Sequence, residues 1–448
     1  MSRANRRQFV KSSAWAAAVG VPALARAGSP NDRIRVGLVG LGGRMHSHVA
    51  ALVQLKKDVD IVAVCDCDEP RVREAEKHYP QLAGLKLARY TDQRRLFDDK
   101  SVDAISFSTQ DHWHALQTIW ACQAGKDVYV EKPCAHTLWE GRKMVEAARK
   151  YKRIVQHGTQ CRSSPNIIEG IRRLKEGIIG EVYMARGMSY KLRGHLGKHR
   201  PQPVPPGLDW DKWVGPSKMV PYSNFYHRRW YWVSNFASGD IANQTVHNID
   251  IIRWGLGLDT HPCQIQSMGG RFPPAADDDA DTPNTQFFGC RFPGRNQLVQ
   301  FEIRHWYTPT EAGMGDQYPF VDHSSVVGVI FFGTQGYMII PDYSSYRTFL
   351  GPKREPGPFA HTPGEPMMDL EHFQNWVKAM RSRNPKDLSA DIEEGHLSTA
   401  ICHLAKIANQ LGRTLQFDPK AERFVNDPEA DRLLTKEYRA PYVVPEHV

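Results

Sequence analysis

The chain has 448 residues, which is more than one ordinary hydrophobic core requires and enough for two domains. Its composition, with 41% hydrophobic and 24% charged residues, is typical of a globular protein and excludes wholesale disorder. Five of the positive charges lie before residue 28, and removing them lowers the formal net charge from +9 to +4. No basic stripe remains that would favour nucleic-acid binding.

Residues 1–27 have the pattern of a twin-arginine export signal. Asn5-Arg6-Arg7-Gln8-Phe9 precedes a run of small apolar residues over 14–25, and Ala25-Arg26-Ala27 is a cleavage motif. The run is shorter than the roughly 20 apolar residues that a membrane anchor needs. We therefore expect cleavage after about Ala27, export through the twin-arginine translocase to the periplasm or beyond, and a mature protein with no membrane segment.

Strand and helix patterns alternate over 28–157, which we assign to a first domain. The expected strands are 34–39, 61–65, 102–108, 127–130 and 153–156. The expected helices are 46–57, 69–78, a short third helix that Leu96-Phe97 closes, 115–124 and 138–151. Strands separated by helices of about ten residues predict a parallel, doubly wound α/β sheet of the Rossmann type.

A glycine-rich turn, Gly40-Leu41-Gly42-Gly43-Arg44-Met45, joins the first strand to the first helix. Such a turn lets the backbone approach a pyrophosphate, which lies on the helix N-terminus. Asp66 ends the second strand, where an acid can hold the ribose hydroxyls and disfavours a 2′-phosphate. This predicts NAD, although Cys67 and Arg71 leave NADP open, and a surface-turn role for Asp66 is the alternative. Met45 replaces the third glycine of the fingerprint.

Glu131-Lys132-Pro133 follows the expected strand 127–130. A lysine delivered there would lie beside the nicotinamide and could touch the hydroxyl being oxidised. Glu131 can hold its ammonium by charge, and Pro133 fixes the local backbone. A solvated lysine at a strand end is the alternative interpretation.

The pattern changes after about residue 158. Helices are expected over 166–175, 246–254, 370–381 and 391–412, and strands over 182–190, 264–268, 286–291, 298–306, 326–332 and 337–340. This mixture predicts an α+β domain over 158–418, built on an open, mainly antiparallel sheet, for substrate binding and oligomerisation. Residues 419–448 form a tail. Most of the tryptophans, such as Trp210, Trp213, Trp230 and Trp232, are expected in the core, with one or two at a sugar.

The cysteines and acidic residues lack the spacing of a metal site. The eight cysteines form no CxxC pair, and a bond within Cys65-x-Cys67 would be strained. The run Ala276-Asp277-Asp278-Asp279 lacks the fixed ligand spacing of a calcium loop. We therefore expect no metal site.

Taken together, the motifs resemble the Gfo/Idh/MocA oxidoreductase family over about residues 33–418. The resemblance rests on the glycine turn, Val64-Cys65-Asp66, Ser108-Thr109-x-x-x-x-His114, Glu131-Lys132-Pro133 and His247-Asn248-Ile249-Asp250. It implies that Lys132 contacts the substrate hydroxyl and that His247 is the general base, a role that also suits the intrinsic pKa of histidine. Asp250, one turn later, would orient His247 or bind a sugar hydroxyl. A core histidine is the alternative for His247.

The expected site has a cofactor part and a substrate part. The cofactor residues are Gly40, Gly42, Gly43, Arg44, Met45, Asp66, Ser108, Thr109, His112, Trp113, Glu131 and Lys132, and the substrate residues are Gln160, Arg162, Asn243 and His247. Asn243 departs from the family, because many members place an aspartate four residues before the catalytic histidine. Asparagine can form hydrogen bonds but cannot accept a proton in this role, so the proton relay cannot be transferred intact.

We expect an NAD(P)-dependent oxidoreductase acting on a hydroxyl of a sugar, polyol or glycoside. His247 would take the proton, Lys132 would polarise the oxygen, and hydride would pass to the nicotinamide. Export removes the cytosolic NAD pool, so we expect a retained cofactor, and the resemblance implies a homo-oligomer. One alternative is an NAD-dependent glycoside hydrolase or lyase that oxidises the sugar transiently, without the usual carboxylate pair. The other is a non-catalytic carbohydrate-binding protein.

Overall fold

A computed structural model describes residues 33–273, 277–306, 308–309, 311, 314, 326–362 and 368–448. The expected export signal over 1–27 and Ala276 of the acidic run lie outside these residues. No helix in the described ranges is both long and apolar enough to cross a membrane.

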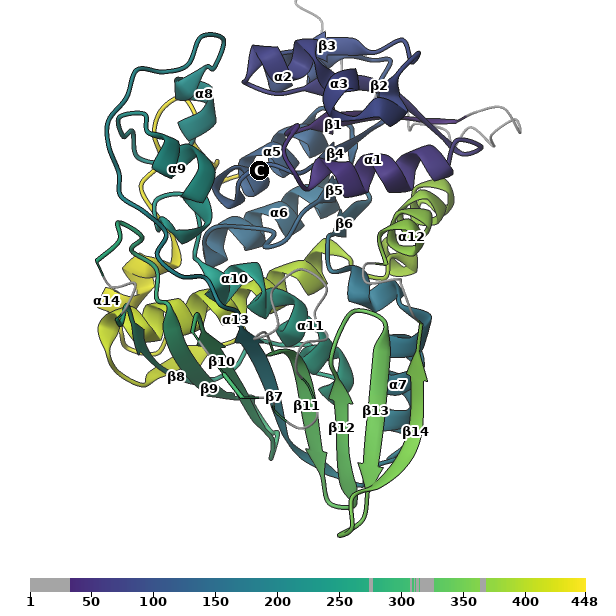
Figure 1. Ribbon diagram of the computed structural model, residues 1–448, viewed down its shortest axis with the longest axis vertical. Coiled ribbons are helices and arrows are strands. Elements are labelled where there is room, and N and C mark those ends of the chain that lie inside the picture. The colour runs from purple at the N-terminus through teal and green to yellow at the C-terminus, as the bar shows by residue number, and fades with distance from the viewer. Residues whose placement is uncertain are drawn as a thin grey trace, which may run out of the picture. The chain divides into compact units, whose positions relative to one another are not determined.

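The first sheet confirms the predicted doubly wound fold (Figure 1). Its strands are β1 (Ile34–Val39), β2 (Val59–Cys65), β3 (Ala88–Tyr90), β4 (Ala104–Phe107), β5 (Asp127–Val130) and β6 (Val155–His157). All neighbours are parallel, in the order β3-β2-β1-β4-β5-β6. The strand order reverses between β1 and β4, and ligands of such sheets bind outside the carboxyl ends of the strands at this switch point.

The helices of this part differ from expectation at two places. They are α1 (Met45–Gln54), α2 (Glu69–Arg73), α3 (Ala75–His78), α4 (Gln93–Asp98), α5 (Asp111–Gln123) and α6 (Leu138–Lys150). The single helix expected over 69–78 is broken at Glu74 into two short ones. Helix α5 begins four residues before the expected start at residue 115, which brings Asp111 to the carboxyl edge of the sheet.

The second sheet confirms the open, mainly antiparallel architecture. Its strands are β7 (Val182–Tyr190), β8 (Gln264–Gly270), β9 (Thr285–Arg291), β10 (Leu298–Arg304), β11 (Val326–Gly333), β12 (Gly336–Ile340), β13 (Ser345–Leu350), β14 (Glu355–His361), β15 (Leu415–Asp418) and β16 (Arg423–Phe424), in the order β14-β13-β12-β11-β7-β10-β9-β8-β15-β16. Only the β7–β10 pair is parallel among the pairs of these ten strands. The sequence did not reveal β14, because Pro356 and Pro358 argue against a strand. At the edge of a sheet, however, a missing N–H removes no ladder bond.

Helices cover one face of the second sheet and link it to the first. The helices after residue 158 are α7 (Pro165–Lys175), α8 (Trp210–Val214), α9 (Asn224–Arg229), α10 (Asp240–Asn243), α11 (Thr245–Leu256), α12 (Asp369–Ser382), α13 (Ile392–Leu411) and α14 (Pro428–Asp431). The 3₁₀ turns of the described chain are Pro80–Leu82, Gln160–Ser163, Trp230–Trp232, Pro385–Asp387 and Arg432–Leu434. Helices α7, α11 and α13 share one apolar core with the strands. Helix α13 also packs against α6, and α12 against α1 (Figure 1).

The chain from Ile34 to Val448 forms one compact unit. The first sheet ends at His157, and Tyr442, Val444 and Val448 of the tail return to its core. The domain division expected at residues 157/158 and at 418/419 therefore stays a prediction.

Candidate active site

A cleft of about 700 Å³ opens at the carboxyl ends of β1, β2 and β4. This volume lies within the range of small-molecule and cofactor sites. Of the residues predicted for the site, those that line the cleft are Gly40, Gly42, Gly43, Arg44, Asp66, Ser108, Thr109, Trp113, Glu131 and Lys132. The sheet edge therefore brings together motif residues that are up to ninety positions apart in the sequence.

The glycines of the turn have two separate physical roles. Gly40 has φ = +87°, and a Cβ there would lie 2.7 Å from the main-chain oxygen of Ser108, so only glycine fits. At Gly42 and Gly43, a Cβ would meet no atom within 4 Å. These two glycines leave open space on the cleft side, which is the room that a pyrophosphate on the turn would need.

Asp66 is held rigidly beside this turn. Its carboxylate accepts the N–H of Leu41 at 2.7 Å and the N–H of Asp68 at 3.0 Å. Arg71 donates to the carbonyl oxygen of Leu41 at 2.9 Å. Burial raises the pKa of Asp66, while these N–H donors and Arg71 act in the opposite direction. The carboxylate is thus oriented at the place where a ribose would lie.

Arg44 and Glu131 form the inner wall of the cleft. Arg44 Nε lies 2.7 Å from Glu131 Oε1, and its Nη2 lies 2.5 Å from Asp369 Oδ1. His48 Nε2 adds a contact to Glu131 at 3.0 Å. Although burial alone would raise it, the charge of Arg44 keeps the pKa of Glu131 well below its usual value. Glu131 makes no direct contact with the ammonium of Lys132, because its Oε1 is taken by Arg44 and His48 and its Oε2 accepts the main-chain N–H of Lys132 at 3.3 Å. Its charge still acts to raise the pKa of Lys132, so the prediction that it holds the ammonium by charge stays a prediction.

The ammonium of Lys132 binds Asn243 instead. Nζ donates to Asn243 Oδ1 at 2.6 Å and to its main-chain oxygen at 2.9 Å. No carboxylate of the described ranges lies at ion-pair distance from Nζ. Burial lowers the pKa of Lys132, and nearby acids partly oppose this. An ammonium has three N–H donors, so one remains for a substrate oxygen.

Asp240 backs this contact from the preceding turn. Asn243 Nδ2 donates to Asp240 Oδ1 at 3.3 Å, and Arg193 and His305 contact the same carboxylate at 3.1 and 2.6 Å. The side chain of Asp240 is fully buried. Burial acts to raise its pKa, but the charge of Arg193 keeps it well below the ordinary value. Position 243 has no carboxylate, but Asp240 supplies one three residues earlier. It is linked to Lys132 through the side-chain amide of Asn243.

His247 lies on α11 near Lys132 but does not line the cleft. It is 3% exposed, its Nδ1 has no hydrogen-bond partner, and its ring packs edge-on against Tyr343 at 5.2 Å. Burial, followed by the positive charge of Lys132, lowers the pKa of His247 well below its usual value. The imidazole is neutral at physiological pH, which is the form that accepts a proton.

Asp250 and Arg162 pair with each other rather than facing the cleft. Arg162 Nε lies 2.7 Å from Asp250 Oδ2, and Ser398 donates to Asp250 Oδ1 at 2.8 Å. Arg162 also contacts Glu394 at 3.0 Å. Both oxygens of the fully buried Asp250 are thus occupied, and it makes no hydrogen bond to His247. The structure therefore does not support the catalytic role predicted for Asp250 or the substrate role predicted for Arg162.

Three further predicted residues lie behind the cleft. Met45 is fully buried in the core beside β1. Gln160 donates to Asp369 Oδ1 at 3.1 Å and thereby supports the carboxylate that holds Arg44. His112 contacts the carbonyl oxygens of Phe236 and Trp213 at 3.2 and 3.1 Å, and burial lowers its pKa to about 3. Both ring nitrogens of His112 are thus occupied, whereas the buried Oε1 of Gln160 has no hydrogen-bond partner.

The sequence reasoning missed Asp111 and the segment around α9. Asp111 is 4% exposed and lines the cleft at the start of α5, and burial raises its pKa. Tyr231, Trp230 and Arg229 line the opposite wall. An acid between a strand end and a helix is a signal that could have identified Asp111.

The tryptophans divide between the cleft and a local core. Those that line the cleft are Trp113, Trp120, Trp213 and Trp230, whereas Trp210 and Trp232 lie in a local core.

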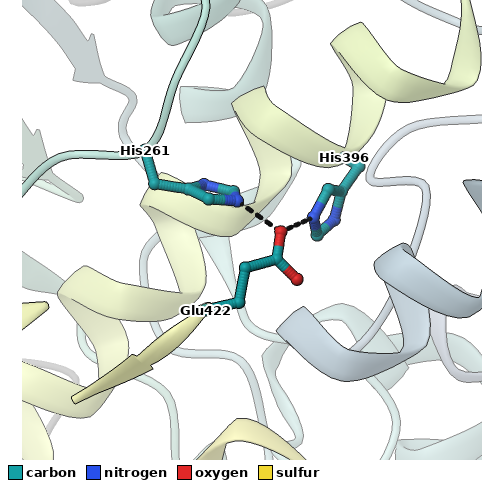
Figure 2. A group of neighbouring side chains, drawn as sticks. All are labelled: His261, His396 and Glu422. Carbon is teal, nitrogen blue, oxygen red and sulfur yellow. Dashed lines mark hydrogen bonds and ion pairs between the residues drawn. The ribbon is translucent and has the colours of Figure 1, made fainter. Parts of the chain in front are cut away.

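One group of metal-ligating residue types lies elsewhere in the described part of the chain, at His261, His396 and Glu422 (Figure 2). Both imidazole Nε2 atoms lie 2.8–2.9 Å from Glu422 Oε1, which is hydrogen-bond geometry. Zinc ligands at 2.0–2.1 Å from a tetrahedral ion are about 3.3 Å apart. Arg142 Nη2 already lies 2.6 Å from the same oxygen. We therefore assign this group to stabilising the turn after β15 and not to metal binding.

Two family models match this chain. Residues 34–159 match the GFO_IDH_MocA model, an oxidoreductase family with an NAD-binding Rossmann fold, and residues 176–276 and 360–444 match the model of its C-terminal alpha/beta domain. Inositol 2-dehydrogenase of Salmonella typhimurium is 30% identical over 158 residues, which are 35% of this chain and 46% of that protein. A glycosyl hydrolase family 109 protein of Shewanella pealeana is 30% identical over 34% of each chain. The chain thus matches less than half the length of these curated relatives.

Solved structures resemble the fold over most of the chain. A levoglucosan dehydrogenase in complex with NADH and levoglucosan has a TM-score of 0.63 at 17% identity, covering 86% of this chain and 99% of that one. Myo-inositol 2-dehydrogenase of Lactobacillus plantarum has a TM-score of 0.62 at 18% identity, covering 86% and 100%. At these identities the likeness shows the fold alone.

The two glycine roles predict different outcomes for alanine substitutions. Gly42→Ala adds a methyl group where the protein has open space, so its melting temperature should equal that of the wild type while NAD binds at least about tenfold more weakly. Gly40→Ala should destabilise the fold by about 1–3 kcal/mol because of the positive φ and the clash with Ser108. Isothermal titration with NAD and thermal unfolding measure both effects. If the folded Gly42→Ala variant bound NAD with wild-type affinity, the dinucleotide would not bind at this turn.

Proposed function

Because the chain belongs to the Gfo/Idh/MocA oxidoreductase family, we propose that it is an NAD-dependent oxidoreductase acting on a hydroxyl of a sugar or polyol. The observation that carries the proposal is the convergence of the open glycine turn, Asp66 and the Lys132 ammonium in one cleft. Bound NAD would supply the hydride acceptor, held by the turn and by Asp66. The names of the similar proteins, which include inositol and levoglucosan dehydrogenases, support a polyhydroxylated substrate.

The residues divide the proton chemistry between them. Lys132 has its third N–H available to a substrate oxygen, where the positive charge stabilises the negative charge that develops on oxidation. His247 is neutral and accepts the hydroxyl proton. Asn243 and Asp240 hold the ammonium in place and keep its charge, which is a positioning role.

We further propose that the cofactor is retained, that the protein is exported and that it forms homo-oligomers. Retention follows from export, because a compartment without an NAD pool cannot replace a released cofactor. Export rests on the sequence pattern over 1–27, and oligomerisation on the family resemblance alone.

A specific observation favours the glycoside hydrolase as a second candidate. Asp111 faces the cleft with a raised pKa, which gives the site an acid–base group in addition to His247. Hydride transfer from an alcohol needs only one base, whereas elimination and re-addition at a sugar need a further acid–base group. The glycosyl hydrolase family 109 relative is consistent with this candidate.

Nucleotide content tests cofactor retention. We expect the protein, purified without added cofactor and then denatured, to release about one dinucleotide per chain, identified by mass spectrometry. Retention predicts a reaction without net redox change, either transient sugar oxidation or exchange between two sugars. An empty protein that reduces added NAD with a sugar would contradict retention and indicate an ordinary dehydrogenase.

Removing the ammonium tests the catalytic assignment. Lys132→Met should lower kcat by about 100-fold or more, because it removes the charge that stabilises the oxyanion, while NAD affinity stays within about threefold. Lys57→Met, at an exposed lysine after α1, is the matched control and should retain full activity. Turnover by Lys132→Met at the wild-type rate would refute the mechanism.

The positioning role of Asp240 predicts a shift in pH dependence. Asp240 raises the pKa of Lys132, so Asp240→Asn should lower it, and the alkaline limb of the kcat profile, where the ammonium loses its proton, should move to lower pH. The acidic limb should stay in place. Asp281→Asn, an exposed aspartate paired with Ser234, is the control. A fall in kcat without movement of the alkaline limb would mean that Asp240 only supports the fold.

A further inference from the structure

A second cavity, of about 500 Å³, lies between α13, the segment 433–439 and the turns at 217–219 and 234–235. None of the residues predicted for the cofactor or the substrate lines it. Its volume is within the range of small-molecule sites and fits a molecule of about hexose size. All of its lining residues belong to the described ranges.

The lining of the second cavity is strongly cationic. The lining contains four cationic side chains and one carboxylate. The cations are Lys218, Lys406, Lys436 and Arg439, and the carboxylate is Glu437. Two of these cations have partners of their own. Arg439 Nη1 lies 2.5 Å from Asp211 Oδ1, and Lys436 Nζ lies 2.9 Å from His136 Nδ1 and 3.4 Å from Glu140 Oε1.

Lys406 differs from these two residues. It is half-buried on α13, its ammonium donates to Ser238 Oγ at 3.3 Å, and no carboxylate in the described part of the chain lies at ion-pair distance. Burial, followed by the charge of Lys436, lowers the pKa of Lys406 to about 8. A half-buried ammonium without a counter-ion costs stability, so a site built around it favours an anion.

The remaining walls suit the body of such a ligand. Met219, Ile407 and Leu433 offer apolar surface for one face of a ring, and Thr435 and Gln410 offer polar groups for hydroxyls. We propose that the second cavity binds a hexose-sized molecule carrying a carboxylate or phosphate group, with Lys406 as the counter-ion of that group. The site is separate from the dinucleotide cleft, and its occupancy requires no turnover.

The test is isothermal titration of the full protein with saturating NAD present, comparing the wild type with Lys406→Gln, so that binding of a sugar in the active-site cleft, which Lys406 does not line, is the same in both proteins. The probes are glucuronate and glucose 6-phosphate, which distinguish a carboxylate from a phosphate ligand, and neutral glucose. We expect one of the two anions to occupy one site per chain that depends on Lys406, and any binding of glucose to be the same with and without Lys406. Lys406→Gln should weaken the anion at least tenfold, and Lys175→Gln, an exposed lysine at the end of α7, should bind as the wild type does.

Two further measurements separate binding from folding. Because Lys406→Gln removes an unpaired charge, its melting temperature should equal or exceed that of the wild type. Met219→Trp should block the cavity from its exposed rim and weaken the anion without changing any charge. The proposal is overturned if neither anion binds to the wild type, if binding of glucose falls as much as binding of the anion in Lys406→Gln, if Lys406→Gln binds the anion with wild-type affinity, or if it unfolds at a clearly lower temperature.

Discussion

The hydrogen bonds from the ammonium of Lys132 to Asn243 are the contact on which the rest of the site depends. They join the end of β5 in the first sheet to α10, which belongs to the second half of the chain and is 111 residues away. A carboxylate at position 243 would form an ion pair with the lysine and hold it by charge. The neutral amide holds it by geometry, and the balancing negative charge of Asp240 stands behind the amide, where Arg193 and His305 fix it.

Glu131 and Arg44 form the second set of contacts that links the two halves of the chain. The two motif residues Glu131 and Lys132 are adjacent, yet their charges are used in opposite directions. The carboxylate turns inward to Arg44 and His48, while the ammonium turns to α10. Arg44 is in turn held by Asp369 at the start of α12. The glycine turn, the end of β5 and the start of α12 are therefore linked through two partly buried ion pairs of Arg44. These pairs rigidify the wall that a nicotinamide would face.

The sequence was sufficient for those features that follow from local pattern. Apolar runs ending at Asp66, Ser108 and Glu131 identify strand ends, and in a parallel sheet these ends meet at one edge, so the cofactor residues could be predicted together. The ion-pair partner of each charged side chain could not be predicted. Asp250 lies one turn after His247, but its charge is taken by Arg162, 88 positions away, and nothing in the local pattern distinguishes the two arrangements. Asp111 was missed because the helix start was placed four residues too late.

Lys132 and Lys406 share a physical feature that other buried lysines lack. Each places a half-buried ammonium against a cavity, with no carboxylate of the described ranges at ion-pair distance. Lys126 shows that this is not simply how the fold buries lysine. Lys126 is 3% exposed, but its ammonium donates to the carbonyl oxygens of Asp99 and Val102 at 2.6 and 2.7 Å and lines neither cavity. A buried cation satisfied by main-chain oxygens has a structural role, whereas one left facing a cavity is free to act on a ligand. By this criterion the substrate oxygen is the missing partner of Lys132, and an anion is the missing partner of Lys406.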